Sequence, residues 1–397
     1  MQKTSKLWTS QFVVIVIMAF LFFLCLQILT AGFPAYITEI KNNPTQAGLM
    51  TTVFMGAAIL TRPFIGYLIQ KINVKQMSMI TLAVLIFTVG LSYGQTSVAL
   101  LLVLRALHGM AFGIITTILS TLATNIIPAK RLGEGIGYYG LATSVGTSAA
   151  PMFALSLLQL YSYNLMIILS VVVTITTLIL GFFVKAPKVE KTADPARKVT
   201  LKEYAFDKKA LLPCILAFFF TITLGGVISF LGGLGNEAGL GASISLFFLM
   251  MTIMMVVVRP FSGRLYDKLG HKVIIYPGAV SGIVGLFLLS ITESTATLLI
   301  AGIFYGFSYG IMTPTLQAIA VGFVEKEKQG TANAMFFSSM DLGIALGSTG
   351  LGILAGATSY HFIYGFSIVS IVVLLLLYTL VFVKGEKAVR ITETETV

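Results

Sequence analysis

Long apolar runs constrain the fold of this sequence more than any other feature. A helix needs about twenty mainly apolar residues to cross ~30 Å of hydrocarbon. About twelve such runs occur, at approximately residues 11–33, 47–69, 76–94, 98–121, 135–158, 163–184, 211–233, 243–262, 272–291, 296–319, 331–356 and 360–383. Hydrocarbon offers no partners for backbone amides, and the runs lack the alternation of a barrel strand, so we expect each run to form a helix.

The composition agrees with a chain whose solvent is largely lipid. Apolar residues make up 57% of the 397 residues, charged residues make up 10%, and the mean hydropathy is +0.95. A soluble domain has roughly half apolar and a quarter charged residues. The first run follows Lys3 and Lys6 like a secretory signal, but its length and the many later runs favour a retained helix.

Basic residues are distributed in a way that predicts the orientation. With a cytoplasmic N-terminus, the outer loops hold only Lys41 of the 26 Lys and Arg, and Arg62, Arg105 and Arg259 fall within spans. The other basic residues then lie in cytoplasmic segments, which predicts a multi-pass protein of the inner (plasma) membrane with both termini cytoplasmic. The net charge of +11 would face anionic lipid, which argues against a nucleic-acid partner.

Cysteine and histidine patterns indicate neither a disulfide framework nor a metal site. Cys25 and Cys214 both lie in apolar runs. The three histidines, at 108, 271 and 361, fall in an outer-half span, an inner loop and an outer loop. No metal cluster or nucleophile–base pair stands out, so we predict no metal, no cofactor and no enzymatic activity.

An internal repeat divides the chain into two similar halves. TRPFIGYLIQKINVK at 61–75 returns as VRPFSGRLYDKLGHK at 258–272, an offset of 259 − 62 = 197 residues. The same offset carries Gly109 onto Gly306, and Ser144 onto Asp341. Glycines alone could reflect generic close packing of membrane helices. The repeated Arg-Pro-Phe-x-Gly favours duplication.

The longest polar segment, residues 185–210, separates six runs from six. Because six is even, both halves enter the membrane from the same side and form a parallel repeat. We therefore predict an all-α integral membrane fold of twelve transmembrane helices in two pseudo-symmetric six-helix bundles. Residues 1–184 would form the first bundle, 185–210 a cytoplasmic linker, and 211–397 the second bundle with a short cytoplasmic tail.

This arrangement resembles the major facilitator superfamily over essentially the whole chain. The signature of that family between spans two and three is roughly Gly-x-Leu-x-Asp-Arg-x-Gly-Arg-Arg/Lys. The second half keeps it as GRLYDKLGHK at 263–272. The first half keeps Gly66 and Lys75, but it has Gln70 in place of the acid and Asn73 in place of a glycine.

Two further signatures lie in spans four and five. Arg105 and Gly109 match the family pattern in span four, with His108 replacing the more usual glutamine. Span five reads GTSAAP from Gly146 to Pro151, a degraded form of the Gly-x-x-x-Gly-Pro of proton-coupled drug exporters. The resemblance thus implies the major facilitator fold and favours export.

The resemblance also implies that the repeated loop forms an inner gate, in which the acid of the signature is held against a helix terminus. The gating residues would be Gly66, Lys75, Gly263, Arg264, Asp267, Gly270 and Lys272. Gln70 cannot supply a charge, so we expect a weaker latch in the first half. The alternative is that these loops only set topology.

Asp341 is the one acid of fifteen that we place deep in a span. It lies about ten residues into its run, or ~15 Å at 1.5 Å per residue. A charge at that depth is costly and usually faces a cavity or a partner. Asp341 could therefore bind and release protons, or it could be a structural acid bonded to neighbouring helices.

Arg105 and His108 share a helical face and complete the set of coupling or substrate-binding candidates. Arginine stays charged, so Arg105 can tune a carboxylate or hold substrate but cannot carry the proton. His108 titrates near neutral pH, although hydrogen bonding between helices is the alternative role. Arg62 and Arg259 are expected to extend to the interface as anchors.

Other polar residues in the central spans are candidates for lining a substrate cavity. They are Gln27, Thr116, Ser120, Thr313 and Gln317. Pro151 and Pro314 free backbone carbonyls within spans and are candidate hinges. One deep acid and many Phe and Met predict an amphipathic, neutral or cationic substrate.

The sequence thus predicts a secondary active transporter. It has no Gly-x-x-x-x-Gly-Lys-Ser/Thr phosphate loop, which leaves an ion gradient as the energy source. We expect a monomer in the lipid bilayer that exports a small amphipathic molecule in exchange for protons, its halves rocking about a midplane site. Proton-coupled uptake of a nutrient is the alternative, and a membrane-embedded enzyme is the remote one.

Overall fold

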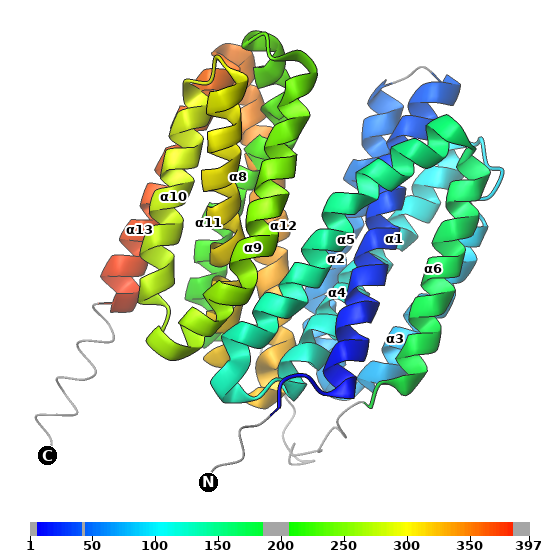
Figure 1. The fold of residues 1–397 in the computed structure, drawn as a ribbon. Coiled ribbons are helices and arrows are strands. Elements are labelled where there is room, and N and C mark those ends of the chain that lie inside the picture. The colour runs from blue at the N-terminus through cyan, green and yellow to red at the C-terminus, as the bar shows by residue number, and fades with distance from the viewer. Residues whose placement is uncertain (1–5, 42–43, 186–205, 384–397) are drawn as a thin grey trace, which may run out of the picture. The chain divides into compact units, whose positions relative to one another are not determined.

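The computed structural model describes residues 6–41, 44–185 and 206–383, and within these ranges all regular structure is helical (Figure 1). Most of the predicted linker, 186–205, lies outside the described residues. The first six long helices are α1 Ser10–Lys41, α2 Pro44–Lys71, α3 Val74–Gly90, α4 Val98–Ile126, α5 Leu132–Leu160 and α6 Tyr163–Phe183. The next six are α8 Lys208–Glu237, α9 Ser245–Leu269, α10 Lys272–Ser290, α11 Thr295–Gly322, α12 Gln329–Ala357 and α13 Tyr360–Leu377.

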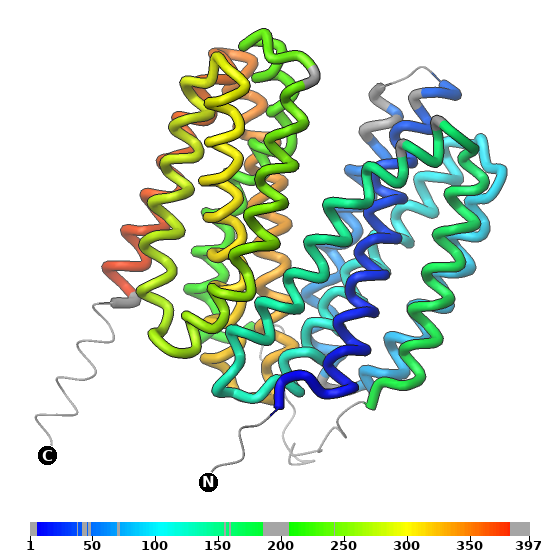
Figure 2. Tube along the Cα trace, viewed as in Figure 1, coloured from blue at the N-terminus to red at the C-terminus, as the bar shows by residue number. Residues whose placement is uncertain are grey.

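Eleven helices in the described part of the chain are long and apolar enough to cross a membrane. The shorter one is α3, with 17 residues, which still spans about 26 Å at 1.5 Å per residue. The predicted all-α membrane fold is confirmed. Figure 2 shows the path of the chain through these helices.

Side-chain caps fix several helix starts. Ser97, Ser162 and Ser359 each accept a hydrogen bond from the backbone N–H three residues on, at the starts of α4, α6 and α13. Asn73 caps α3 in the same way, accepting from Lys75 and the next residue. The asparagine that replaces the signature glycine in the first half therefore has a local structural role.

The helices divide into two compact units. The first contains residues 1–210 together with 320–338, and the second contains 211–319 together with 339–397. The end of α11 and the first part of α12 thus belong to unit 1. The boundaries at 184 and 211 stay a prediction.

The sequence repeat is visible as equivalent close contacts inside each unit. A Cβ at Gly109 would collide with the backbone carbonyl of Phe54, where α4 crosses α2. A Cβ at Gly306 would meet the backbone of Met251, where α11 crosses α9. Both partners obey the same offset, since 54 + 197 = 251. Small residues allow helix backbones to approach this closely.

Large apolar side chains point outward as well as inward. Phe182, Ile179 and Ile353 are among the many exposed ones. The buried core of unit 2 includes Val227 and Tyr305 and extends over α8 to α13. A surface so rich in exposed apolar residues suits contact with lipid rather than water.

Replacing Gly109 by alanine tests the close approach of α4 to α2. The added Cβ would force two backbones apart, and overpacking of this kind costs about 1–3 kcal/mol. We expect Gly109→Ala to lower the midpoint of thermal unfolding in detergent. Gly56→Ala is the matched control, because nothing lies within 4 Å of a Cβ at that helical position, and it should leave the midpoint unchanged or raise it. Equal effects of the two substitutions would contradict the proposed contact.

Candidate transport site

Arg105 is fully buried in unit 1 and links three helices. Its Nε donates to the carbonyl oxygen of Met50 on α2 at 3.2 Å, and Nη2 donates to Oγ1 of Thr30 on α1 at 3.2 Å. Its guanidinium carbon lies 4.2 Å from the ring centroid of Phe54 and 5.2 Å from that of Phe33. Within the described residues, Nη1 has no hydrogen-bond partner. The charge is therefore held by ring faces, a hydroxyl and a carbonyl rather than by a carboxylate.

His108 lies beside Arg105, as its spacing predicted. Its ring is fully buried, and the centroids of His108 and Phe33 are 6.0 Å apart. It faces the backbone carbonyl of Thr88 on α3, but neither ring nitrogen makes a regular hydrogen bond among the described residues. A second positive charge beside Arg105 in an apolar shell would be costly, so we infer a neutral imidazole in this state.

Arg62 and Arg259 are buried, and the expectation that they anchor at the interface is wrong. They are 2% and 4% exposed. Arg62 Nη1 donates to Oγ1 of Thr116 at 3.0 Å and to Oγ1 of Thr117 at 3.3 Å. Its guanidinium carbon also lies 5.0 Å from the ring centroid of Phe337, in the third turn of α12. Hydroxyls and aromatic rings between the helices thus solvate the Arg62 guanidinium, in place of the water that it would meet at the membrane interface.

Ser120 and Asn333 form a second polar contact in unit 1. Ser120 Oγ donates to Asn333 Oδ1 at 3.0 Å, and Asn333 Nδ2 donates to Oγ1 of Thr124 at 3.4 Å. All three side chains are buried. Sequence reasoning missed Asn333, although an amide within an apolar run was an available signal.

Asp341 lies in unit 2, near the middle of α12, and is partly exposed. Tyr309 on α11 is within electrostatic range of both Asp341 and the buried Arg259 on α9. Arg259 Nε has no hydrogen-bond partner among the described residues. Tyr309 thus interacts with both the acid and the guanidinium, and the sequence alone did not single out this phenol.

Equivalent positions in unit 1 show what is particular to unit 2. Phe112 corresponds to Tyr309 and Ser144 to Asp341 by the offset of 197 residues. Arg62 lies over the Phe112 ring, with its guanidinium carbon 5.6 Å from the centroid. Both units thus keep the arginine. At the other two positions unit 1 has a phenyl ring and a hydroxyl, and unit 2 has a phenol and a carboxylate.

The predicted cavity-lining residues have different environments. Thr116, Ser120, Thr313 and Gln317 are buried, and Gln27 is partly exposed. The candidate hinges lie inside helices, Pro151 exposed in α5 and Pro314 buried in α11. Thr313 donates to the backbone carbonyl of Tyr309, one turn earlier in α11. The roles of these seven residues stay predictions.

The gating-loop residues lie at one end of their helices. Gly66 and Gly263 are buried in α2 and α9, and Gly270 ends α9 with φ 78°, a conformation that glycine adopts readily. Arg264 is exposed and Asp267 partly exposed near that end. Lys272 is the first residue of α10.

Lys75 has a defined partner at the same end of unit 1. Its Nζ donates to the carbonyl oxygen of Phe182 at 2.7 Å, at the C-terminus of α6. A cation in that place satisfies a terminal carbonyl and complements the helix dipole. The gating roles of these loop residues stay predictions.

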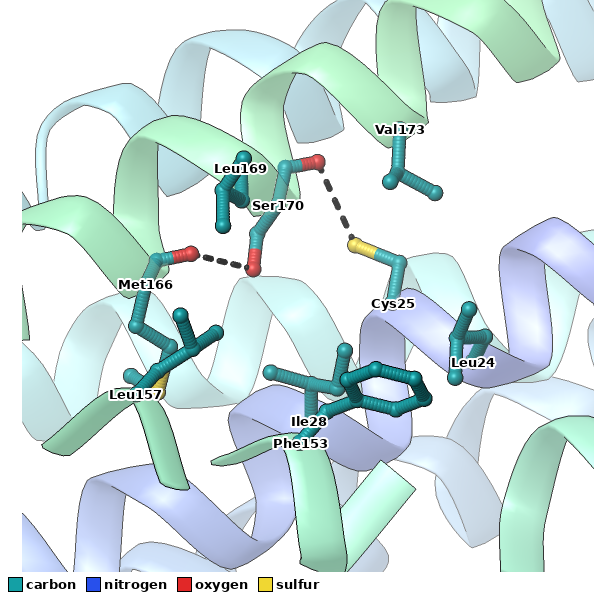
Figure 3. Close-up of a pocket in the computed structure, with 9 residues that line it drawn as sticks. All are labelled: Leu24, Cys25, Ile28, Phe153, Leu157, Met166, Leu169, Ser170 and Val173. Carbon is teal, nitrogen blue, oxygen red and sulfur yellow. Dashed lines mark hydrogen bonds between the residues drawn. The ribbon is translucent and has the colours of Figure 1, made fainter. Parts of the chain in front are cut away.

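A pocket of about 180 Å³ lies within unit 1 among α1, α5 and α6 (Figure 3). It is lined by Leu24, Cys25, Ile28, Phe153, Leu157, Met166, Leu169, Ser170 and Val173. The Cys25 thiol donates to the carbonyl of Ser170 at 3.4 Å. The lining includes none of the three coupling candidates, so this pocket offers apolar contact rather than a charge.

The described residues form twelve long helices in repeated halves, eleven of them long and apolar enough to span a membrane, with buried arginines and a mid-helix acid. This architecture is typical of a secondary transporter. The sequence matches the Major Facilitator Superfamily over residues 15–348 and 279–396, and the chain belongs to this family. It is therefore a multi-pass membrane transporter and not an enzyme. Transporters of this family bind small molecules and often couple their movement to protons.

Relatives with stated functions include proteins of more than one kind. The chain is 22% identical to the staphylopine export protein of Staphylococcus aureus over 377 residues, covering 91% of this chain and 93% of that protein. It is 23% identical to the riboflavin transporter RibZ of Clostridioides difficile, covering 81% of this chain and 82% of that protein.

Solved structures with the same fold share little sequence. The human organic anion transporter MFSD10 superposes with a TM-score of 0.78 at 14% identity, over 92% of this chain and 98% of its own. The Escherichia coli fucose:proton symporter FucP superposes with a TM-score of 0.74 at 14% identity, over 91% and 97% of the two chains. These likenesses show the fold alone.

An ion pair at the start of α8 provides a test of pH dependence. Asp207 Oδ2 lies 3.1 Å from Lys328 Nζ. Burial raises the pKa of the Asp207 carboxyl, but the hydrogen bond from the Lys209 amide and the contact with Lys328 outweigh it, so the pKa is lowered. A lowered pKa stabilises the fold above the unfolded value of about 3.9, and the contribution is lost as pH falls further.

We therefore expect Asp207→Asn to reduce the free energy of unfolding at pH 7 by about 0.2–1 kcal/mol, since Lys328 is partly exposed. The difference from the parent chain should shrink as pH falls below the unfolded value and be smaller at pH 3 than at pH 7. Unfolding in detergent at the two pH values measures it. Lys328→Met should produce a similar loss, and the double variant no further one. A loss that is the same at both pH values would exclude the ion pair as its cause.

Proposed function

We propose that this transporter exports a small amphipathic molecule in exchange for protons. Support comes from the likeness to a staphylopine export protein along nearly the whole of both chains, and from the span-five sequence between Gly146 and Pro151. Proton coupling rests on Asp341, the one mid-helix acid among the described residues, which lies within electrostatic range of the Tyr309 phenol. The membrane would be the plasma membrane, with both termini cytoplasmic and the protein a monomer.

Asp341 has the chemistry that proton coupling requires. A carboxyl can alternate between charged and neutral forms, whereas arginine stays charged. The phenol of Tyr309, which lies within electrostatic range of Asp341, can donate a hydrogen bond to a carboxylate and would favour its charged form. Protonation of Asp341 would thus remove a charge from a low-dielectric region. The neutral and charged forms can then favour different conformations.

Arg105 and His108 would serve binding rather than proton transfer in this proposal. The Nη1 of Arg105 is buried and has no partner among the described residues, so a substrate acceptor atom would relieve a real cost. His108 would remain neutral as long as no substrate atom accepts a hydrogen bond from Arg105. Gln27, Thr116, Ser120, Thr313 and Gln317 would supply further polar contacts, and Pro151 and Pro314 would allow bending.

The gate would differ between the halves. Asp267 would act as the charged latch among Gly263, Arg264, Gly270 and Lys272 in the second half. The first half, with Gly66 and Lys75, has no acid in its signature. There the neutral contact between Asn333 and Ser120 would help to hold the cytoplasmic parts of α12 and α4 together.

Uptake by proton symport is the second candidate. FucP, a fucose:proton symporter, shares the fold, and a riboflavin transporter is among the relatives. Both directions use the same protonatable acid.

We expect Asp341→Asn to reduce proton-driven accumulation at least tenfold, because the amide cannot bind or release the coupled proton. Ethidium, an amphipathic cation, is a suitable first probe in membrane vesicles. Ser144→Asn places the same amide at the repeat-equivalent position without removing an ionisable group, and it should preserve accumulation. Expression and folded yield should be unchanged in both variants. Undiminished coupled transport by Asp341→Asn would remove this acid from the mechanism.

The direction of transport can be read in inverted vesicles. Export predicts that ethidium accumulates inside vesicles whose interior is acidified, and that a protonophore abolishes the accumulation. Uptake predicts accumulation only in right-side-out vesicles with an alkaline interior. Transport of neither ethidium nor a panel of neutral amphipathic dyes would contradict the proposed substrate class, and a wider screen in cells stripped of their own exporters would follow.

A further inference from the structure

A histidine at the end of unit 2 joins three segments of the chain. His361, in the first turn of α13, has Nδ1 2.6 Å from Oε1 of Glu237, the last residue of α8. Its Nε2 lies 2.9 Å from the backbone carbonyl oxygen of Thr292, between α10 and α11. The other oxygen of Glu237 accepts a hydrogen bond from the Tyr360 amide at 2.7 Å.

Both ring nitrogens of His361 thus face acceptors. A neutral imidazole has one N–H and can satisfy only one of them, whereas an imidazolium donates to both. A proton shared with Glu237 resides on the ring, because imidazole is a stronger base than a carboxylate. The charged groups that face His361 are Glu237 from α8 and Glu293 from the segment between α10 and α11. Both are acidic and favour the charged ring.

The residues around this contact pack the end of α8 against the start of α13. The Tyr360 ring packs directly over Gly233 of α8, and its centroid is 6.2 Å from that of Phe230. The side chains of His361 and Glu237 remain 24% and 31% exposed. Solvent protons can therefore reach the pair, which lies next to the packed rings of Tyr360 and Phe230.

We propose that His361 and Glu237 form a pH-responsive clamp that holds the ends of α8 and α13 together when the ring is protonated. Loss of the proton leaves one N–H for two acceptors, so one of the two links is broken and the helix ends separate more often. In the orientation proposed above, this end of unit 2 faces the outside, and the clamp responds to external pH. The closure itself does not depend on which substrate is transported or in which direction.

A thiol-labelling experiment on the full-length chain in liposomes tests the clamp. Leu234, fully buried in the last turn of α8, is replaced by cysteine, and its reaction with a membrane-impermeant maleimide reports opening of the helix ends. The chain without this substitution gives the background from Cys25 and Cys214. Labelling is measured at pH 6.0 and 8.5 outside, with the internal pH fixed.

We expect the ratio of the labelling rate at pH 8.5 to that at pH 6.0 to be about two- to fivefold larger with His361 than in the His361→Gln variant, the range expected for an exposed ion pair. Comparison of these ratios cancels the greater thiolate content at high pH. Glu237→Gln should behave like His361→Gln. Equal ratios in all three chains would overturn the proposal.

A second measurement avoids the buried reporter. The thermal midpoint of the chain without added cysteine should fall on His361→Gln at pH 6.0 and change little at pH 8.5. His271→Gln is the comparison at the opposite end of unit 2, and it should not reproduce this pattern. A loss of stability in His361→Gln that is the same at both pH values would indicate a packing role and reject the clamp.

Discussion

The cost of a charge in an apolar interior is the constraint on which the described arrangement depends. Arg62, Arg105 and Arg259 are all buried within helices that span the membrane. An isolated charge there would be costly unless paired or hydrogen-bonded. Threonine hydroxyls, a backbone carbonyl and the faces of phenylalanine rings meet this need for the first two. Such partners do not neutralise the charge. The interior therefore keeps a positive potential that can act on a carboxylate or a substrate.

The duplication gives each half the same helix crossings but different chemistry. Gly109 and Gly306 set equivalent backbone contacts, while Phe112 and Ser144 of one half become Tyr309 and Asp341 in the other. Close packing leaves little freedom at the glycines, whereas residues beside the arginine can change without moving a helix. Polar specialisation of one half is thus compatible with a conserved scaffold, and it agrees with a transporter in which the halves have separate tasks.

Much of the fold, but less of the site, follows from the sequence. Run length predicted the helices, and the repeat predicted which glycines are equivalent, because both depend on local composition and a constant offset. The direction of Arg62 was mispredicted, because a long side chain near a helix end can reach either the interface or the interior. The contact between Ser120 and Asn333 joins residues 213 positions apart, so no local pattern could have identified it. The neighbours of Asp341 depended likewise on which helix faces meet.

A transporter must exchange conformations, so the strength of its internal contacts matters as much as their number. A hydrogen bond between neutral groups contributes about 0.5–1.5 kcal/mol, whereas removing one partner of a buried ion pair costs about 3–5 kcal/mol. Asn333 holds Ser120 and Thr124 through neutral bonds only. Lys328, five residues before Asn333, forms an ion pair with Asp207 but remains partly exposed to solvent. Breaking the neutral contacts leaves no charge in the apolar interior. When the ion pair opens, Lys328 can be solvated while Asp207 keeps the hydrogen bond from the Lys209 amide. Contacts of these kinds suit a reversible transport cycle.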